Sequence, residues 1–486
     1  MSDFHFVGAA YQAPSIYQDD QECINLYPEV DPLKITPSAI NPSGDRGVTA
    51  LYPTPGLLLK LNLPTNAQVR GLWVLPSGST MLAVAGSQVY LINAQFIAQQ
   101  VGILSSNIGL VSIVDNGIHA YLADGNNRYT YNITSQEFAM VASSDGAFQG
   151  ADKVDNVDGF IIYNKPNSNQ WGCTNVLSAT SSGLNFSAKA SSSDKIVSLI
   201  ADHTDVHLIG ERTTEVWTNV GAFPFPFQRI PGVTSQHGCA AKDSLTKLGE
   251  SIAYISKDTR GQGVVVHTNG YTVERISTFA VENDINKGVI SDAIAYTYQQ
   301  SGHEFYVLSF PTQDKTWVYD LATQLWHKRA NRDAFNVYHR HRGNCVASFQ
   351  GIIVIGDYQN GNLYELSQTT YTENGALIPR VRRCPHLTSD LKRQYFHDLQ
   401  IQFQPGVGLV TGQGSNPKAM LRWSDDGGST WSNEHWVDIG TLGAYKNRAI
   451  WRRLGQARDR IFEVVVTDPI YCVIISANLN ATAGTS

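Results

Sequence analysis

Short apolar runs separated by turn-forming residues dominate the sequence, and the clearest example is Val69–Leu104. This stretch holds four such runs, each closed by Gly, Pro, Ser or Asn: Val69–Leu75, Met81–Ala85, Gln88–Asn93 and Phe96–Leu104. Runs of this length, rich in Val, Leu, Ile and aromatic residues, predict strands, and the closures predict tight turns. We therefore predict a small four-stranded antiparallel sheet. It needs neighbours of the same kind, because so small a sheet is not stable alone.

The same plan recurs along the chain. Leu110–Ala142 repeats it, and less regular copies follow at Lys153–Ala190, Ile196–Pro231, Ala241–Thr278, Ala293–Arg329 and Val337–Leu366. The starts are spaced by roughly 40–50 residues, which is typical of propeller repeats. We predict an all-β protein with a β-propeller of about seven blades over residues 51–368; six or eight blades would also fit. A single short helix is expected, over Ala280–Gly288.

An early strand is expected to close the ring. Pro55–Leu63 (PGLLLKLNL) reads as a strand standing before the first repeat. The seventh unit supplies only three strands: Cys345–Gln350, Ile352–Gly356 and Asn362–Leu366. Pairing the early strand with this last unit would remove two exposed sheet edges.

The two ends of the chain follow a different pattern. Residues 1–50 have little regularity and are predicted to form an extended N-terminal arm, with one plausible strand at Cys23–Val30. Residues 369–394 are predicted to be a basic linker. Residues 395–486 are predicted to form a smaller C-terminal β-sandwich-like domain with five strands: Phe396–Phe403, Ala419–Ser424, Ala449–Leu454, Ile461–Val466 and Tyr471–Leu479.

Composition narrows the class of protein. No apolar run in the 486 residues is long enough to span a bilayer, and the start, MSDFHFVGAAYQ, has no secretory pattern, so no membrane insertion is expected. The six cysteines are far apart and form no CxxC pair, which predicts buried free thiols in a reducing compartment: Cys23, Cys173, Cys239, Cys345, Cys384 and Cys472.

Charge is unevenly distributed. From Tyr371 onward there are 13 Lys and Arg against 10 Asp and Glu, whereas the first 370 residues hold 23 basic and 32 acidic residues. An acidic body does not wrap DNA tightly, since phosphate contacts need Lys and Arg. It is compatible with a channel through which DNA slides without sticking. Charge alone favours the simpler interpretation, an acidic surface that maintains solubility.

The sharpest local motif is Ser424–Trp431, which fits the S-x-D-x-G-x-T-W pattern of the Asp box found in sialidases and other propellers. The Asp side chain accepts turn amides, Gly permits positive φ and Trp packs beneath the hairpin, so the motif serves folding. A sialidase would also need an arginine cluster and a Tyr–Glu pair, which the sequence does not assemble. With no other catalytic motif present, we predict a non-enzyme without catalytic, cofactor-binding or metal-binding residues.

Two further stretches invite a functional interpretation. The Pro-rich aromatic loop Phe223–Phe227 is expected either to pack on its own rings or to contact a partner subunit. In the run from His339 to Arg342, His339 and His341 would share one face of a strand, predicting a solvated or DNA-facing basic edge, since two histidines do not make a metal site.

Several segments, in their order, resemble the packaged-DNA stabilisation proteins of short-tailed bacteriophages. The residues concerned are YPTPGLLLKL…VRGLW, LIGERTTEVW…FPFQRIPG, the Asp-box turn, the R-x-x-W-R-R-L-G-x-x-R run at Arg448–Arg458 and the apolar strands that end the chain. The resemblance covers most of the chain from about residue 50 onward.

This resemblance implies a virion structural protein that forms a tail hub or nozzle. Such proteins assemble as a homohexameric ring below the portal and the head-to-tail adaptor, retain packaged DNA and form part of its exit channel. The implied partners are the adaptor, a tail needle or tailspikes, and double-stranded DNA passing through the lumen without sequence-specific binding. The implied location is the virion tail, assembled in the host cytoplasm. The alternatives are a glycan-binding or sialidase-like tail protein and a cytoplasmic propeller scaffold.

Six arginines are the candidate assembly residues. Arg forks bind carboxylates bidentately, so as a set we expect them to pair with carboxylates of neighbouring subunits or of the adaptor, whereas any single one could instead lie over the sandwich surface: Arg380, Arg382, Arg383, Arg448, Arg452 and Arg453.

Overall fold

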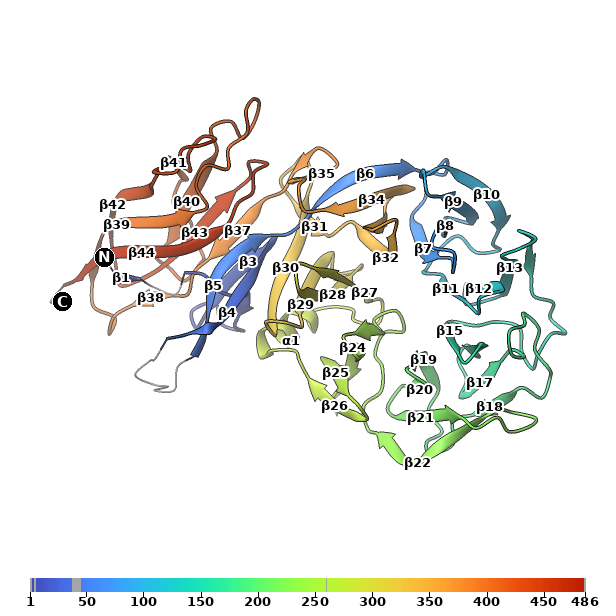
Figure 1. Cartoon of the computed structure of the whole chain (residues 1–486). Coiled ribbons are helices and arrows are strands. Elements are labelled where there is room, and N and C mark those ends of the chain that lie inside the picture. The colour runs from blue at the N-terminus through green and yellow to red at the C-terminus, as the bar shows by residue number, and fades with distance from the viewer. Residues whose placement is uncertain (1, 4–5, 37–44, 259, 485–486) are drawn as a thin grey trace.

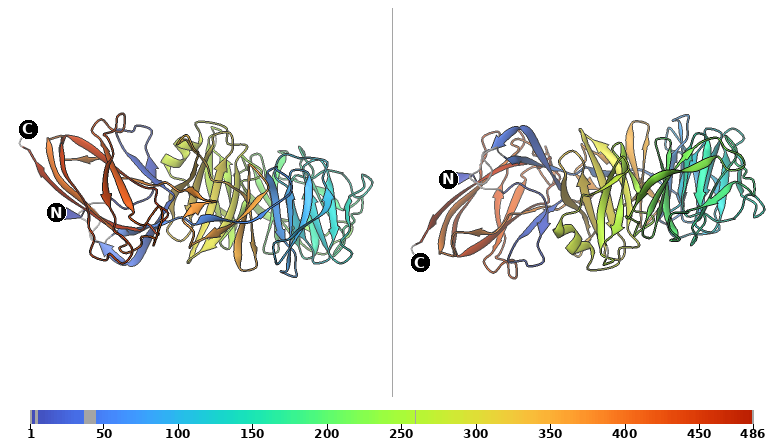
Figure 2. Two further views of the ribbon diagram at one scale, coloured as in Figure 1. Left: turned by 90° about the horizontal axis from the view of Figure 1, so that it is seen from above. Right: turned by 90° about the horizontal axis from the view of Figure 1, so that it is seen from below.

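The computed structural model describes all residues except 1, 4–5, 37–44, 259 and 485–486. Two β domains lie side by side, a ring of blades and a sandwich (Figure 1). Seen from above and below, the sandwich continues the line of the propeller disc beyond its rim (Figure 2). Both flat faces of the propeller are therefore left open by the second domain.

Seven blades, here called A to G, form the ring from the described residues: A to E are separate four-stranded antiparallel sheets, and F and G are four-stranded parts of larger sheets. Blade A is β7 (Val69–Val74), β8 (Thr80–Ala85), β9 (Gln88–Asn93) and β10 (Ala98–Ile103); blade B is β11 (Ser112–Asp115), β12 (His119–Ala123), β13 (Arg128–Asn132) and β14 (Phe138–Met140). Blade C is β15 (Val154–Val157), β16 (Phe160–Asn164), β17 (Gln170–Cys173) and β18 (Phe186–Ala188); blade D is β19 (Ile196–Asp202), β20 (Asp205–Gly210), β21 (Thr214–Asn219) and β22 (Phe227–Ser235).

The remaining blades follow the same order. Blade E is β23 (Thr246–Leu248), β24 (Ser251–Lys257), β25 (Gly263–Asn269) and β26 (Thr272–Arg275). Blade F is β27 (Ile294–Gln300), β28 (His303–Phe310), β29 (Lys315–Asp320) and β30 (Leu325–Arg332), extended by β31 (Tyr338–Arg340). Blade G is β32 (Gly343–Phe349), β33 (Ile352–Asp357), β34 (Asn362–Ser367) and β6 (Gly56–Asn62), with β35 (Thr372–Glu373) and β36 (Ala376–Leu377) added at its edge. The predicted seven-bladed propeller is confirmed.

Alternation along each strand explains why the blades pack face to face. In β8, Met81, Ala83 and Ala85 belong to the core between blades A and G. Leu82 and Val84, pointing the other way, belong to the core between blades A and B. Successive side chains of a strand leave opposite faces of the sheet, so one strand serves two interfaces.

The predicted closure of the ring is confirmed. β6 pairs antiparallel with β34 as the fourth strand of blade G, in a register that joins Leu57 to Leu366 and Asn62 to Asn362. Leu57 is fully buried with Ile355 and Tyr364. The predicted helix is also present, as α1 (Phe279–Ile285), with the Thr278 side chain at its N-cap accepting from the Val281 amide.

The second domain is a sandwich, as predicted. One sheet has the order β4 (Leu26–Thr36), β5 (Asp45–Pro53), β44 (Ile474–Ala483), β39 (Gln394–Phe403) and β42 (Ala449–Ala457), with β1 (Ser2–Asp3) beside β44. The other has β3 (Asp20–Ile24), β37 (Arg380–Arg383), β43 (Asp459–Val466), β40 (Lys418–Ser424) and β41 (His435–Asp438), with β2 (Tyr11–Gln12) on β3 and β38 (Leu387–Thr388) on β43.

Two predicted segments are corrected by this topology. The stretch 1–50 is not an extended arm, because β3, β4 and β5 are strands of the sandwich sheets. The stretch 369–394 is not a linker, because β37 lies between β3 and β43. β3 also pairs with β30 at Ile24 and Lys328, so the sheet of blade F continues into the sandwich. The repeat pattern of the blades does not reveal β3 and β37, because these strands pair with segments far away in the chain and not with the next strand.

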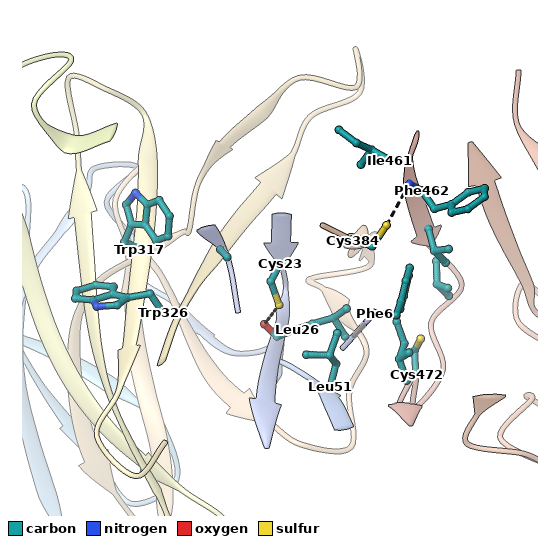
Figure 3. Close-up of a cluster of buried hydrophobic side chains, with 14 of the residues drawn as sticks. Phe6, Cys23, Leu26, Leu51, Trp317, Trp326, Cys384, Ile461, Phe462 and Cys472 are labelled. Carbon is teal, nitrogen blue, oxygen red and sulfur yellow. Dashed lines mark hydrogen bonds between the residues drawn. The ribbon is translucent and has the colours of Figure 1, made fainter. Parts of the chain in front are cut away.

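The two domains share one apolar core (Figure 3). Trp317 and Trp326 come from blade F, Phe462 and Ile461 from the sandwich, and the N-terminal segment fills the space between with Phe6, Cys23, Leu26 and Leu51. All six cysteines are free and five are buried, which confirms the predicted buried thiols. Burial raises the pKa of Cys23 and of Cys384 to about 12, so both remain thiols.

The ring closure gives a direct test. Leu57→Ala removes a fully buried side chain from the closing strand and should lower the free energy of unfolding by about 2–5 kcal/mol. Leu58→Ala, at the adjacent position whose side chain is 43% exposed, should change it by less than about 0.5 kcal/mol. The measurement is denaturant unfolding followed by tryptophan fluorescence. Equal losses in the two variants would contradict the packing of β6.

Candidate functional site

The joint between propeller and sandwich is centred on Asn25, between β3 and β4. Its side chain donates to the carbonyls of Ala330 (2.8 Å), in blade F, and Pro379 (2.9 Å), beside β37, and its Oδ1 accepts from the Ala330 amide (3.0 Å). The residue is buried and has φ of 55°, a conformation that Asn adopts more readily than most residues. One amide side chain therefore fixes three segments of the chain.

Arg382 holds the N-terminal segment from the sandwich side. It is fully buried and donates to the carbonyls of Phe6, Ala9 (3.0 Å) and Glu22 (3.2 Å) and to the Gln21 side chain (2.8 Å). Carbonyl groups satisfy its donors, which is how a buried guanidinium avoids an uncompensated desolvation cost. Arg382 therefore fixes the N-terminal segment against β37 of the sandwich.

The expectation of six arginines on an external joint is wrong for three of them. Besides Arg382, Arg380 is buried and donates to the carbonyls of Asp468 (3.1 Å) and Tyr371 (3.4 Å). Arg383 pairs with Glu463 (2.7 Å) and with Asp20. All three lie on β37, whose sequence RVRR is mostly charged although its first three residues are buried, so the sequence indicated a solvated linker.

The other three arginines are on the surface. Arg448, Arg452 and Arg453 are exposed at or beside the edge strand β42, and Arg448 donates to Gln400 (2.8 Å). Among the residues that the structure describes, Arg452 and Arg453 form no ion pair. Only this part of the predicted set is available to a neighbouring molecule.

A histidine links the propeller to strand β4. His303 Nδ1 lies 2.7 Å from the Asp320 carboxylate and Nε2 lies 2.8 Å from the Glu29 carboxylate. The two acids, Asp320 foremost, raise the pKa of His303 above its ordinary value of 6.5, although burial acts in the opposite direction. The contact therefore favours an imidazolium between two carboxylates, one from each side of the joint.

The Asp box acts as the folding motif that the sequence predicted. Asp426 accepts from the Thr430 amide (2.8 Å) and hydroxyl (2.6 Å), and these bonds lower its pKa to about 2. Trp431 is half-buried between the guanidinium groups of Arg383 and Arg422, each 4.8 Å from its ring. The acid side chain is occupied by its own turn.

The interpretation of residues 339–342 as a basic edge is wrong. His339 is near the surface and pairs with Asp314 (2.6 Å), but His341 is fully buried beyond the end of β31, where Tyr296 lies 3.0 Å from its ring. Arg340 is also buried and stacks on Tyr358 at 3.7 Å. Burial and nearby guanidinium groups lower the pKa of His341 well below its ordinary value.

The aromatic loop packs on its own rings, as the first of its two predicted arrangements requires, except at Phe223. Phe225 and Phe227 pack on Trp171, with ring centroids 5.0 and 5.3 Å from that of Trp171, whereas Phe223 is 94% exposed.

In the described parts of the chain, no group of three or more His, Cys, Asp or Glu side chains could hold a metal ion. Within those same residues, no helix is long and apolar enough to cross a membrane.

The fold defines the class of protein: a seven-bladed β-propeller that shares one apolar core with a β-sandwich. A protein-family model described as the β-propeller of bacteriophage P22 Gp10 matches residues 51–371, and the model of the β-sandwich of the same protein matches residues 379–482. The chain belongs to the P22 Gp10 family and is a phage tail protein of that type. The resemblance inferred from the sequence is thereby confirmed. No curated protein matches the sequence.

Solved structures similar to the chain include three propeller-sized proteins. The N-terminal domain of Nup159 has 11% identity and a TM-score of 0.42, covering 71% of this chain and 99% of its own. A chain of the mitotic checkpoint complex has 16% identity and a TM-score of 0.43, covering 71% and 100%. The WD40 propeller of Doa1 has 12% identity and a TM-score of 0.40, covering 64% and 97%. Likenesses at this level say nothing about function.

Removing the guanidinium of Arg382 should detach the N-terminal segment. Arg382→Met leaves several buried carbonyls without donors, and we expect a loss of about 3 kcal/mol or more in unfolding free energy. Proteolysis should then cleave the first 20 residues faster than in the native chain. Arg452→Met, which removes an exposed guanidinium, is the matched control and should leave both readouts unchanged. Protection of the segment in Arg382→Met would contradict its role.

The His303 contact predicts a pH dependence. Because its pKa is raised in the folded state, the contact stabilises the fold fully below about pH 6.5 and this contribution disappears as pH rises through the raised value. The difference in thermal midpoint between the native chain and His303→Gln should therefore be larger at pH 6 than at pH 9. His397→Gln, at an exposed histidine, should show no such trend. A difference that grows toward high pH would refute the assignment.

Proposed function

We propose that the chain forms a homohexameric hub or nozzle ring in the tail of a short-tailed phage, below the portal and the adaptor. The ring retains packaged DNA and forms part of the channel through which DNA leaves. Tail needle or tailspike proteins attach nearby, and assembly takes place in the host cytoplasm. The protein is a structural part and has no catalytic role.

The family match over both domains is the observation that carries this proposal. The shared core and the continuous sheet through β30, β3 and β37 support it, because a part that bears the pressure of packaged DNA needs domains that do not move against each other. The acidic excess of the first 370 residues is compatible with DNA that slides past the protein without being held.

A glycan-binding or sialidase-like tail protein is the competing function. The Asp box gives it no support, since Asp426 is engaged by Thr430 within its own turn. A purified chain that cleaves or binds bacterial surface polysaccharide would favour this alternative over the hub.

The exposed arginines of β42 provide the test of the hub. We expect them to contact carboxylates of the adaptor or of a neighbouring subunit, so Arg452→Glu with Arg453→Glu should give a folded protein that fails to complete the tail. The measurement is the fraction of full heads in a lysate where the variant replaces the native chain, beside the oligomer mass of the purified variant.

A matched control reverses two charges elsewhere on the sandwich, so that both variants have the same net charge. Lys392→Glu with Arg393→Glu makes the same change at two exposed positions just before β39, beyond the Gln394–Ala457 end of the β39–β42 pair, and should leave full heads at the native level. Full, infectious particles built from the β42 variant would show that this surface is not the joint. Tails that never contain the native chain would refute the hub itself.

A further inference from the structure

The two flat faces of the propeller differ in the chain segments that form them. In each antiparallel blade, the turns between the first and second strands and between the third and fourth strands lie on one face, here called the turn face. The turns between the second and third strands, and the connections to the next blade, lie on the other, here called the connection face. Because the sandwich lies beyond the rim, it covers neither (Figure 2).

A basic depression lies on the connection face between blades D and E. Its volume is about 930 Å³, and its lining includes two acids, Glu211 and Asp258, and three cations, Arg212, Lys257 and Arg260, which leaves an excess of one positive charge. All three side chains are exposed and form no ion pair with any described residue. Lys195, also exposed, lies beside the depression, because its carbonyl accepts a hydrogen bond from the Glu211 amide (3.0 Å). Most other cations on this face are neutralised, for example Lys153 by Asp243 (2.8 Å).

The turn face of the same blades is acidic. Asp202 and Asp205 flank the β19–β20 turn, and Glu250, whose side chain is 98% exposed, is at the tip of the β23–β24 turn. The Tyr271 hydroxyl donates to Asp205 (2.7 Å), so the carboxylates of neighbouring turns are held in one surface. The His203 ring lies 3.6 Å from the Glu250 carboxylate.

The two surfaces lie at opposite ends of one strand. Glu250 directly precedes β24 and Lys257 is its last residue, so the two side chains are separated by roughly 20 Å, at about 3.3 Å per residue. Opposite charge on opposite faces cannot pair within one molecule. It can pair between copies whose propellers face the same way around a ring.

We infer that successive subunits bind face to face, with the acidic turns of blades D and E of one copy seated in the basic depression of the next. This is a heterologous contact, the type that closes into a ring when its rotation permits. Complementary charge fixes which face meets which and excludes contacts between like faces. The inference deepens the proposed ring and rests on it.

Zero-length cross-linking tests the contact directly. Tails assembled on heads are treated with a water-soluble carbodiimide, which joins a carboxyl to an amine in contact, and the cross-linked peptides are identified by mass spectrometry. We expect links from Glu250 or Asp205 to Lys257 or Lys195. A mixture of isotopically light and heavy chains should give mixed-mass pairs, because the distance along β24 forbids the Glu250–Lys257 link within one chain.

Charge reversal provides the second arm. Arg212→Glu with Lys257→Glu, and separately Asp205→Lys with Glu250→Lys, should each reduce incorporation into tails at least tenfold. The two variants co-expressed should restore incorporation, since each then supplies the complement of the other. Lys392→Glu with Arg393→Glu is the matched control and should incorporate normally.

The outcomes separate the inference from the function on which it rests. Native tails that hold a ring of this chain but give no cross-links between the faces, or reversal variants that incorporate normally, would overturn the face-to-face contact alone. Reversal variants that form rings yet fail to bind another tail protein would overturn it too, assigning the depression to an acidic partner. Absence of the native chain from tails would instead refute the proposed function, and the face-to-face contact with it.

Discussion

The structure depends on a small set of buried hydrogen bonds that hold the N-terminal segment between two incomplete domains. Neither sheet of the sandwich is complete without β3, β4 and β5, and the core between Trp326 and Phe462 is filled by Phe6, Cys23 and Leu26. Asn25 and Arg382 fix that segment through carbonyl groups on both sides. An unsatisfied buried guanidinium or amide is costly, so these bonds tolerate little displacement. The rigidity of the whole chain follows from them.

Rigidity of this kind is compatible with the proposed place of the chain in a tail ring. Most linked domains meet through a modest polar interface and move relative to each other. Here a sheet crosses the boundary from β30 through β3 to β37, and one apolar core extends on both sides. Bending the joint would break backbone hydrogen bonds and expose apolar side chains together. Surface charge on either domain is thereby presented at a fixed distance from the other, as an assembly with defined symmetry requires.

The parts of the fold that could be predicted are those governed by local periodicity. Alternation in strands such as β8, and the missing strand of blade G, were sufficient to predict seven blades and their closure by β6. The joint could not be predicted in this way, since β3 and β37 pair with strands far away and Arg382 looks like a solvated charge in sequence. Val381 and Cys384 are the apolar residues of this stretch, and at three positions apart they give no strand periodicity. Likewise, nothing local distinguishes buried His341 from near-surface His339.

The order in which the chain is made gives the joint a further consequence. Strand β6 and the segment around Asn25 leave the ribosome early, yet their partners are about 300 to 350 residues downstream, as the bonds from Asn25 to Ala330 and Pro379 show. Loop closure over such separations is slow, and unpaired strand edges aggregate. Strand β6 and the segment around Asn25 must therefore wait until these partners, between residues 330 and 379, have been made. The ring cannot close before β34 has been made, and the sandwich sheets cannot be completed before β43 and β44, so the assembly-competent shape is reached only after both domains have received their late strands.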